Sequence, residues 1–194
     1  MVVVGLDEAG AGPGFGSLWA GAVYLKSEIT GVDDSKRLSE RKRNLLRPKI
    51  EEGSHYGLGE VTSTEIDELG MAEARRLVFE RALDNYVERN GPEPTFLEID
   101  GTIFRPWKRN GVVVPYRLTP GGDALYPCVS AASILAKTTR DAQIIQLCKE
   151  HPELNERYDL CANKGYLSKR HMDGIQTYGM TDGHRRSFKI ARRV

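Results

Sequence analysis

Two adjacent carboxylates, Asp7 and Glu8, follow an apolar, β-branched run at the start of the chain. The run Val2-Val3-Val4 is typical of a strand buried on both faces and predicts a strand over residues 2–6. Buried carboxylates are costly unless they are paired, and neighbouring ones repel each other. The first basic residue is Lys26, so no cation close in sequence neutralises them. The pattern favours a divalent metal ion at the end of this strand, and the alternative is a pair of solvated turn acids.

A glycine-rich stretch, from Gly10 to Gly16, follows the two acids. Glycine lets another molecule approach the main chain closely. A Gly-x-Gly after a first strand also occurs in dinucleotide-binding domains, where the turn opens into a helix that binds pyrophosphate. Here Pro13 and the glycines disfavour a helix, and residues 17–25 are better explained as a second strand. The dinucleotide interpretation is therefore the weaker one.

Length and composition indicate one globular domain, which we predict to span residues 1–194. The 194 residues, 40% hydrophobic and 28% charged, are enough for one sizeable core. No apolar run approaches the ~20 residues needed to span a bilayer, and we expect no signal peptide before the first strand. Three cysteines without Cys-x-x-Cys spacing support neither a disulfide framework nor a thiolate zinc site. We expect a cytoplasmic protein that does not contact membranes.

Basic residues are concentrated in two segments, although the formal net charge is only +1. Seven basic residues and one acidic residue lie between Lys36 and Lys49. Eight basic and two acidic residues lie between Lys164 and the last residue. Such segregation fits a surface that binds a polyanion on one side, and the alternative is a set of solvated helix faces.

Periodicity and turn residues predict alternating strands and helices. The predicted strands are residues 2–6, 17–25, 55–61, 95–100 and 111–118. The predicted helices run from the N-cap Ser39 to about Glu52, from Ser63 or Thr64 to Asn90 with Gly70 as a candidate break, and from Ser130 to about Glu150. Short helices and loops follow over residues 152–194. This order predicts an α/β fold, a mixed sheet flanked by helices, with a small helical C-terminal extension.

Two further carboxylates lie beside glycines at predicted strand ends or in loops. Asp100 ends a strand and precedes Gly101, and Asp123 follows Gly121-Gly122, a sequence also common in simple turns. Sites in open α/β sheets assemble at strand ends and the loops after them. Several carboxylates with few histidines favour Mg²⁺ or Mn²⁺ over zinc.

The chain resembles the ribonuclease HII family. Residues 5–13 are similar to its opening motif, Asp-Glu-Ala-Gly-Arg-Gly-Pro. Further matching blocks occur in the family's order and cover nearly the whole chain: Asp34-Ser35-Lys36-Arg37-Leu38-Ser39, Asp100-Gly101, Gly122-Asp123, residues 130–137, Arg140-Asp141, Asn163-Lys164-Gly165-Tyr166, His171, and His184-Arg185-Arg186-Ser187-Phe188.

This resemblance implies a ribonuclease H-like fold and a metal-dependent endoribonuclease. It implies hydrolysis of the RNA strand of RNA/DNA hybrids and incision at ribonucleotides embedded in duplex DNA. The implied catalytic and metal-binding residues, which hold two Mg²⁺ or Mn²⁺ ions, are Asp7, Glu8, Asp100 and Asp123. Two such ions activate the water and hold the leaving oxygen, so no side-chain nucleophile is needed.

The resemblance also implies how substrate is bound. Main-chain groups of Gly10, Ala11 and Gly12 are expected to meet the ribose 2′-hydroxyl. Tyr166 is expected to pack on the sugar of the neighbouring deoxynucleotide, and its alternative role is that of a core tyrosine. Phosphate contacts are expected from basic residues, which add salt-dependent affinity without reading sequence: Lys36, Lys137, Lys164 and Arg185.

One position departs from the family motif, because Ala11 replaces its arginine. The main-chain contacts survive this change, but a guanidinium able to bind a phosphate is lost. Junction recognition could therefore be altered. The other open alternatives are a different carboxylate-metal nuclease of the same fold and a catalytically silent hybrid-binding protein. We expect a monomer, and the sequence shows no clamp-binding pattern of glutamine and paired aromatics at its C-terminal end.

Overall fold

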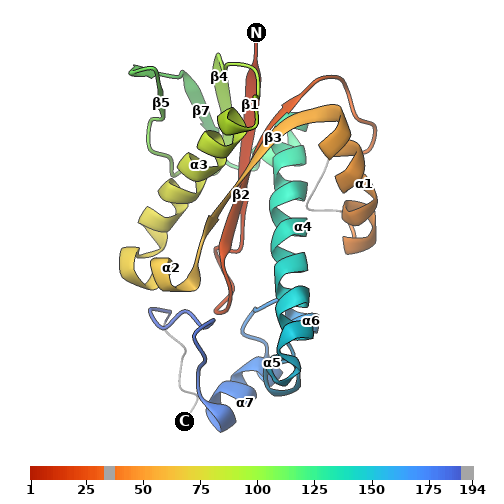
Figure 1. Cartoon of the computed structure of the whole chain (residues 1–194), viewed down its shortest axis with the longest axis vertical. Coiled ribbons are helices and arrows are strands. Elements are labelled where there is room, and N and C mark those ends of the chain that lie inside the picture. The colour runs from red at the N-terminus through yellow and green to blue at the C-terminus, as the bar shows by residue number, and fades with distance from the viewer. Residues whose placement is uncertain (33–37, 189–194) are drawn as a thin grey trace.

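The computed structural model describes residues 1–32 and 38–188, and Figure 1 shows their arrangement. The chain alternates strands and helices, which confirms the predicted α/β class. In chain order the elements are β1 (Val3–Ala9), β2 (Leu18–Leu25), α1 (Glu40–Gly53), β3 (Ser54–Val61), α2 (Ser63–Leu69), α3 (Met71–Glu88), β4 (Phe96–Asp100), β5 (Lys108–Arg109), β6 (Val112–Val113), β7 (Tyr116–Thr119), the 3-10 helix η2 (Gly122–Ala124), α4 (Pro127–Glu150), α5 (Pro152–Tyr158), α6 (Leu160–Asn163) and α7 (Lys169–Tyr178).

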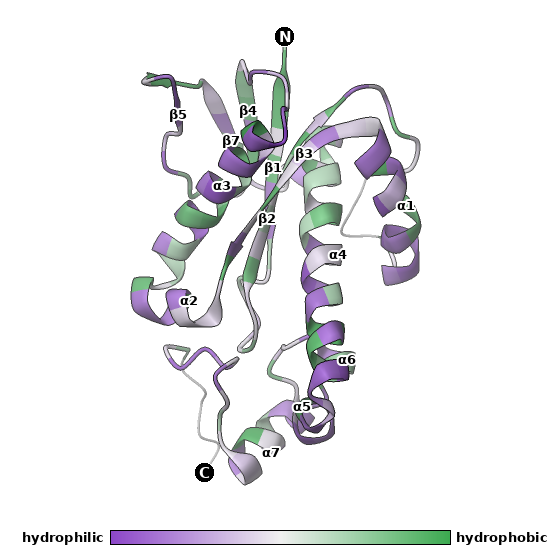
Figure 2. Cartoon of the chain, in the orientation of Figure 1, coloured by the Kyte–Doolittle hydropathy of each residue, from purple (hydrophilic) through white to green (hydrophobic). Residues whose placement is uncertain are grey.

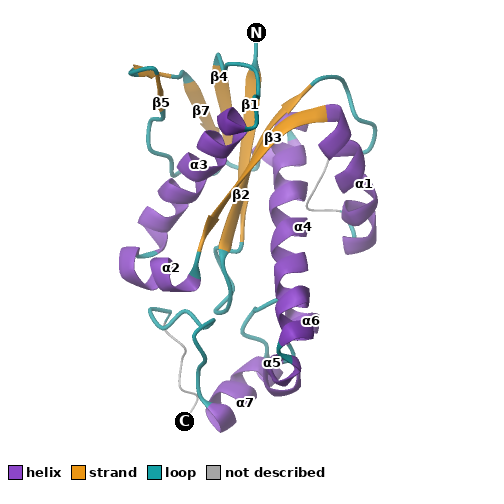
Figure 3. Cartoon of the chain, viewed as in Figure 1, coloured by secondary structure: helices purple, strands orange, loops and turns teal. Residues whose placement is uncertain are grey.

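Five strands form one sheet in the order β3-β2-β1-β4-β7, and the sheet is mixed, as predicted. The strands β3, β2 and β1 are antiparallel, whereas β4 runs parallel to β1 and β7 parallel to β4. Leu6 lies beside Ile99, and Asp100 lies beside Thr119. The carboxyl ends of β4 and β7 therefore lie beside the last part of β1, at one edge of the sheet. Figure 3 shows β1, β4 and β7 as neighbouring strands.

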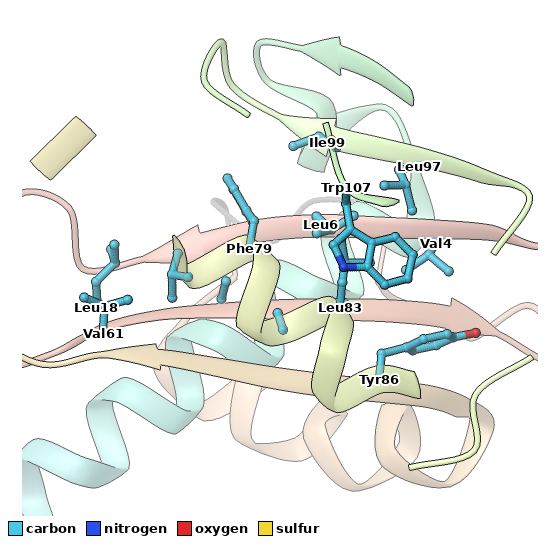
Figure 4. Packing of buried hydrophobic residues seen from close by; sticks show 14 of the residues in the cluster. Val4, Leu6, Leu18, Val61, Phe79, Leu83, Tyr86, Leu97, Ile99 and Trp107 are labelled. Carbon is cyan, nitrogen blue, oxygen red and sulfur yellow. The ribbon is translucent and has the colours of Figure 1, made fainter. Parts of the chain in front are cut away.

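The two long helices pack on opposite faces of the sheet. Val4 and Leu6 of β1 share a buried core with Phe79 and Leu83 of α3, as Figure 4 shows. Gly5, which lies between those two strand residues, faces the backbone of α4 instead. Since successive side chains of a strand point to opposite faces, α3 covers one face of β1 and α4 covers the other.

The helix α4 approaches the sheet more closely than side chains would permit. A Cβ placed on Gly5 would lie 2.3 Å from the carbonyl carbon of Cys128, and one on Gly21 would lie 2.7 Å from the carbonyl oxygen of Ala132. Both neighbouring atoms belong to the helix backbone, which cannot rotate away. These two glycines are therefore required for α4 to pack against β1 and β2.

The ends of two helices differ from the prediction. Thr62, not Ser63 or Thr64, is the N-cap of α2, and it forms a capping box with Glu65. Gly70 does separate α2 from α3, with a φ of 76°. The helix α4 begins at Pro127, before the predicted Ser130, because proline is accommodated in the first turn.

Two strands also differ from the prediction. β1 does not end before the acids but continues to Ala9, because Asp7 and Glu8 still pair with β2. The strand predicted over residues 111–118 is divided into β6, which forms a hairpin with β5, and β7, which joins the main sheet. Pro115 lies between them, and proline has no N–H to donate to a sheet.

The last three helices gather at the C-terminal end of α4 (Figure 1). Phe15 from the glycine-rich stretch shares a buried core there with Ile144, Tyr158 and Leu160. Figure 2 shows that α1, by contrast, is largely hydrophilic along its length. Within residues 1–32 and 38–188, no helix has the length and apolar character that crossing a membrane requires.

Candidate active site

The predicted carboxylates are brought to the shared edge of the three parallel strands. Asp7 and Glu8 lie in the last part of β1, beyond the point where it pairs with β4. Asp100 is the last residue of β4. Asp123 lies in η2, which follows β7 after a short turn, and it is buried. Parallel pairing thus places residues from distant parts of the sequence at one edge.

Asp7 and Glu8 leave β1 on opposite faces of the sheet, because they are successive strand residues. Glu8 is on the α3 face, where Nη2 of Arg75 lies 2.5 Å from its Oε1. Asp7 is on the α4 face, where the Ser133 side chain donates a hydrogen bond to it. The negative charge of Asp100 acts on both carboxylates. The site therefore straddles the sheet edge.

The surroundings of Asp7 and Glu8 disfavour the charged form of each carboxylate. Burial, and after it the negative charge of Glu8, raises the pKa of Asp7 well above its usual range. Burial also raises the pKa of Glu8, although the positive charge of Arg75 acts in the opposite direction. Each shift means that the charged form gains too little from its surroundings to offset desolvation. A cation bound between them would relieve this cost.

The donor set fits a hard divalent cation. Oε2 of Glu8 is buried and has no hydrogen-bond partner, which is a costly state for a carboxylate oxygen. Carboxylate oxygens are the ligands that Mg²⁺ and Mn²⁺ favour. As they stand, no three His, Cys, Asp or Glu residues in the described part of the chain are grouped closely enough to hold an ion. The fit therefore rests on donor chemistry and on the unpaired oxygen of Glu8.

Arg75 is a residue of this site that the sequence analysis missed. It lies on α3, far along the chain from Glu8, and no motif marks it. Its Nη2 also lies 3.3 Å from where a Cβ on Gly101 would be, so the guanidinium reaches the loop after β4 as well. No basic residue lies close in sequence to the two acids, but Arg75 neutralises Glu8 from a distant helix. Distance along the chain does not exclude such a pair, because the α3 face of the sheet brings the two residues together.

Asp100 and Asp123 are linked through the turn between them. The backbone N–H of Gly122 donates to Oδ1 of Asp100 over 2.8 Å. Asp123 is the next residue, so this hydrogen bond fixes the start of η2 beside the end of β4. The two acids, separated in sequence, are thus held on adjoining parts of the backbone.

A glycine-rich loop (residues 10–17) follows β1 and is held by a buried guanidinium. Arg140 of α4 is fully buried and donates to the carbonyl oxygens of Phe15, Ser17 and Lys164 over 2.7–3.2 Å. Gly10 has a φ of 104°, and a Cβ on it would lie 2.5 Å from Nε of Arg140. Glycine is required there both by the backbone conformation and by the close arginine.

Arg185 does not fit the predicted phosphate contact. It is fully buried, and its guanidinium donates to the carbonyl oxygens of Pro13, at 2.8 Å, and Gly16, at 2.9 Å. A longer contact of 3.4 Å reaches the carbonyl oxygen of Ala11. Burial, and after it the charge of Arg140, lowers the pKa of Arg185 to about 9. A phosphate cannot reach a fully enclosed side chain, so Arg185 supports the loop from inside.

Tyr166 lies beside the glycine-rich loop. This is the position expected if both contact neighbouring nucleotides of one substrate. Its Cε1 is 3.5 Å from where a Cβ on Gly12 would be, and the residue is half exposed. The backbone N–H of Gly14 donates to the carbonyl oxygen of Gly165 over 3.0 Å. The tyrosine ring is therefore surface-accessible next to the loop, which disfavours the alternative of a core tyrosine.

The predicted basic residues are placed differently from one another. The ammonium group of Lys137 lies 2.7 Å from Oδ1 of Asp141, and its side chain is 28% exposed. Lys164 is less exposed, and it donates to the carbonyl oxygen of Cys161 and lies 3.8 Å from Glu40. Lys36 lies outside the described residues. A role in substrate binding stays a prediction for all three.

A five-stranded mixed sheet with carboxylates at or after the ends of its parallel strands is the architecture of ribonuclease H-like hydrolases. A sequence model described as Ribonuclease HII matches residues 4–191. The chain belongs to the ribonuclease HII family.

Individual relatives agree with this assignment. The chain is 39% identical to a ribonuclease HII of Sphingopyxis alaskensis, over 96% of this chain and 88% of the relative. It is similar to the crystal structure of ribonuclease H2 from Pyrococcus horikoshii, with a TM-score of 0.75, 30% identity, and coverage of 99% and 96% of the two chains. A structure of Bst-RNase HIII in complex with Mn²⁺ shares the fold, with a TM-score of 0.69, 20% identity, and coverage of 92% and 63%. The protein is accordingly a ribonuclease H enzyme.

Proposed function

We propose that this protein hydrolyses the RNA strand of RNA/DNA hybrids and incises duplex DNA at embedded ribonucleotides, with two divalent metal ions. The single observation that carries this proposal is the buried Glu8 carboxylate, with one oxygen unpaired, beside Asp7 and Asp100 at the ends of parallel strands. Family membership supports the activity on hybrids.

The four carboxylates would hold the ions. Asp7 would reach them from the α4 face of β1, Glu8 from the α3 face, and Asp100 from the end of β4. Asp123 would complete the set from η2. Bound Mg²⁺ or Mn²⁺ would activate a water and stabilise the leaving 3′-oxygen of a phosphodiester. The Mn²⁺ complex of the Bst-RNase HIII relative supports a divalent ion in this family of folds.

The residues of the protein orient the substrate. Arg140 and Arg185 bind carbonyl oxygens of the glycine-rich loop on its inner side and so hold the conformation of the loop. Gly12 and the half-exposed Tyr166 lie next to each other. We propose that the loop contacts the 2′-hydroxyl and that Tyr166 packs on the adjacent deoxyribose.

A cleavage assay on three labelled substrates tests this proposal. The substrates are a DNA duplex with one ribonucleotide, a uniform RNA/DNA hybrid and an all-DNA duplex, each with Mg²⁺, Mn²⁺ or EDTA. We expect metal-dependent cleavage of the first two and none of the third. Cleavage of the all-DNA duplex would favour a different nuclease of this fold, and binding of the hybrid without metal-dependent cleavage would indicate a catalytically silent binder.

A further inference from the structure

Two buried histidines lie where the glycine-rich loop meets Tyr166. His171 is on α7, and His184 is in the C-terminal segment (residues 179–188). Their exposed fractions are 0% and 1%, and their Nε2 atoms lie 3.1 Å apart. The rings are enclosed by Phe15 and Tyr158, whose ring centroids lie 4.8–6.4 Å from those of the histidines.

The hydrogen bonds around this pair define one tautomer for each ring. The backbone N–H of Thr181 donates to Nδ1 of His184 over 2.9 Å, so that nitrogen carries no proton. Neutral His184 then carries its proton on Nε2 and donates to Nε2 of His171. His171 in turn carries its proton on Nδ1 and donates to the carbonyl oxygen of Tyr166 over 2.9 Å. The hydrogen-bond network thus assigns one neutral tautomer to each ring. One added proton on Nε2 of His171 would place that N–H against the Nε2–H of His184.

The same pair is joined to the glycine-rich loop. His184 forms an isolated β-bridge with Phe15, whose ring meets the imidazole edge-on at a centroid distance of 4.9 Å. Next to this bridge, the backbone N–H of Arg185 donates to the carbonyl oxygen of Gly14 over 2.8 Å. The loop is thus bonded to the main chain on either side of His184, and the side chains of His184 and His171 link that segment to the main chain of Tyr166.

We propose that His171 is a positioning residue that holds the main chain of Tyr166 beside the glycine-rich loop, and that His184 fixes the tautomer of His171 in which Nδ1 donates to Tyr166. They thereby set how strongly the enzyme prefers a lone ribonucleotide in DNA over a uniform hybrid. This inference rests on the proposed function, because it requires Tyr166 to contact the deoxynucleotide beside the ribonucleotide. Neither histidine is a catalytic residue, since both rings are buried and bind protein atoms.

The first test is spectroscopic and needs no substrate. Long-range ¹⁵N–¹H NMR spectra distinguish the two neutral tautomers of histidine, and the chain has four histidines to assign. At pH 7 we expect His171 with its proton on Nδ1 and His184 with its proton on Nε2. The opposite tautomers, or an imidazolium at either position, would overturn the proposal.

The second test uses two conservative variants of His171. The amide nitrogen of His171→Asn can replace Nδ1 and keep the bond to Tyr166, and it donates whatever His184 does because an amide has no tautomer to fix. The amide oxygen of His171→Gln can replace Nε2 and keep only the bond from His184. Each variant removes one bond of comparable strength, so a merely structural role would alter both alike. We expect the ratio of lone-ribonucleotide to hybrid cleavage rates to fall about threefold to tenfold in His171→Gln and to stay near the wild-type value in His171→Asn. Equal ratios in the two variants would overturn the proposal.

The outcome can be separated from a failure of the proposed function. If the wild-type protein cleaves neither substrate, the positioning role is tested by NMR instead. The backbone amide chemical shifts of Gly12 and Tyr166 in each variant are compared with those of the wild type. Larger shifts in His171→Gln than in His171→Asn would support the positioning role, and equal shifts would overturn it. If His171→Gln does not fold, the tautomers of the wild-type protein decide alone.

Discussion

Nη2 of Arg75 lies 2.5 Å from Oε1 of Glu8, so an arginine from α3 neutralises one of the two adjacent acids on β1. The other oxygen of that carboxylate has no partner. Glu8 therefore has one oxygen paired with a protein cation and one buried oxygen without a hydrogen-bond partner. This arrangement places a positive charge in competition with any metal ion that binds the same carboxylate.

Removing that charge should strengthen metal binding. We expect Arg75→Gln to bind Mn²⁺ on the order of tenfold more tightly, ~1.4 kcal/mol, because a neighbouring positive charge opposes a cation at this partly buried site. Isothermal titration calorimetry measures the affinity directly. Arg76→Gln is the matched control, since the next arginine of α3 pairs with Glu73 instead. Unchanged or weaker Mn²⁺ binding in Arg75→Gln would show that Arg75 does not compete with the metal.

The Asp100→Asn variant should abolish cleavage and leave hybrid binding largely intact. The amide keeps the shape of the side chain but removes a charge that would hold the ions. Asp173→Asn, on the exposed part of α7, is the control and should cleave like the wild type. The measurements are initial rates in saturating Mg²⁺ and hybrid affinity in EDTA. Retention of more than about a tenth of the wild-type rate would remove Asp100 from the catalytic set.

The Tyr166→Ala variant should slow incision at a lone ribonucleotide more than cleavage of a uniform hybrid. A uniform hybrid offers no deoxyribose in the cleaved strand for the ring to pack on, so little is lost there. Tyr166→Phe keeps the ring and should retain the preference. Single-turnover rates on both substrates test this, and equal slowing would identify Tyr166 as a general binding residue.

The Ala11→Arg variant tests the departure from the family motif. A restored phosphate contact should steepen the slope of log K against log salt by roughly 0.9 on a duplex with one ribonucleotide. The gain should appear in KM, because an interaction made equally in ground and transition states leaves kcat unchanged. A rise in kcat instead would indicate that arginine aligns the scissile phosphate. Absence of any effect would show that Gly10 and Gly12 suffice.

Acid should destabilise the protein through His184. Burial lowers its pKa in the fold from 6.5 to about 4, whereas an unfolded histidine keeps the ordinary value. Since the unfolded chain binds more protons between those values, the free energy of unfolding should fall as pH drops from about 6.5 to about 4 and stop falling below. The contribution of this group to the loss is about 3 kcal/mol.

Urea unfolding at several pH values checks this prediction. Other groups also titrate in this window, and the raised pKa of Asp7 acts in the opposite direction, so the comparison must be between variants. The slope should shrink in His184→Gln and persist in His151→Gln, whose histidine is exposed. Parallel curves for His184→Gln and the wild type would contradict the assignment.

Local patterns were sufficient for most of the secondary structure. The apolar run before Asp7 predicted β1, and Ser39 was correctly predicted as the N-cap of α1. Prediction failed at the ends of strands and helices, because the residues that pair or pack with an end determine where it lies. β1 continues through the two acids because β2 supplies its hydrogen bonds, and Pro115 divides a strand whose two parts pair with different neighbours.

By itself the sequence determined the fold class and the family and predicted the four acids of the site, because strand and turn propensities and motif order are local properties of the chain. The tertiary structure alone decided which charges meet. Arg75 pairs with Glu8 across the face of a sheet, Arg185 is buried beneath the loop rather than exposed, and His171 meets His184. Burial and pairing between distant residues depend on how elements pack, and spacing along the chain does not specify them.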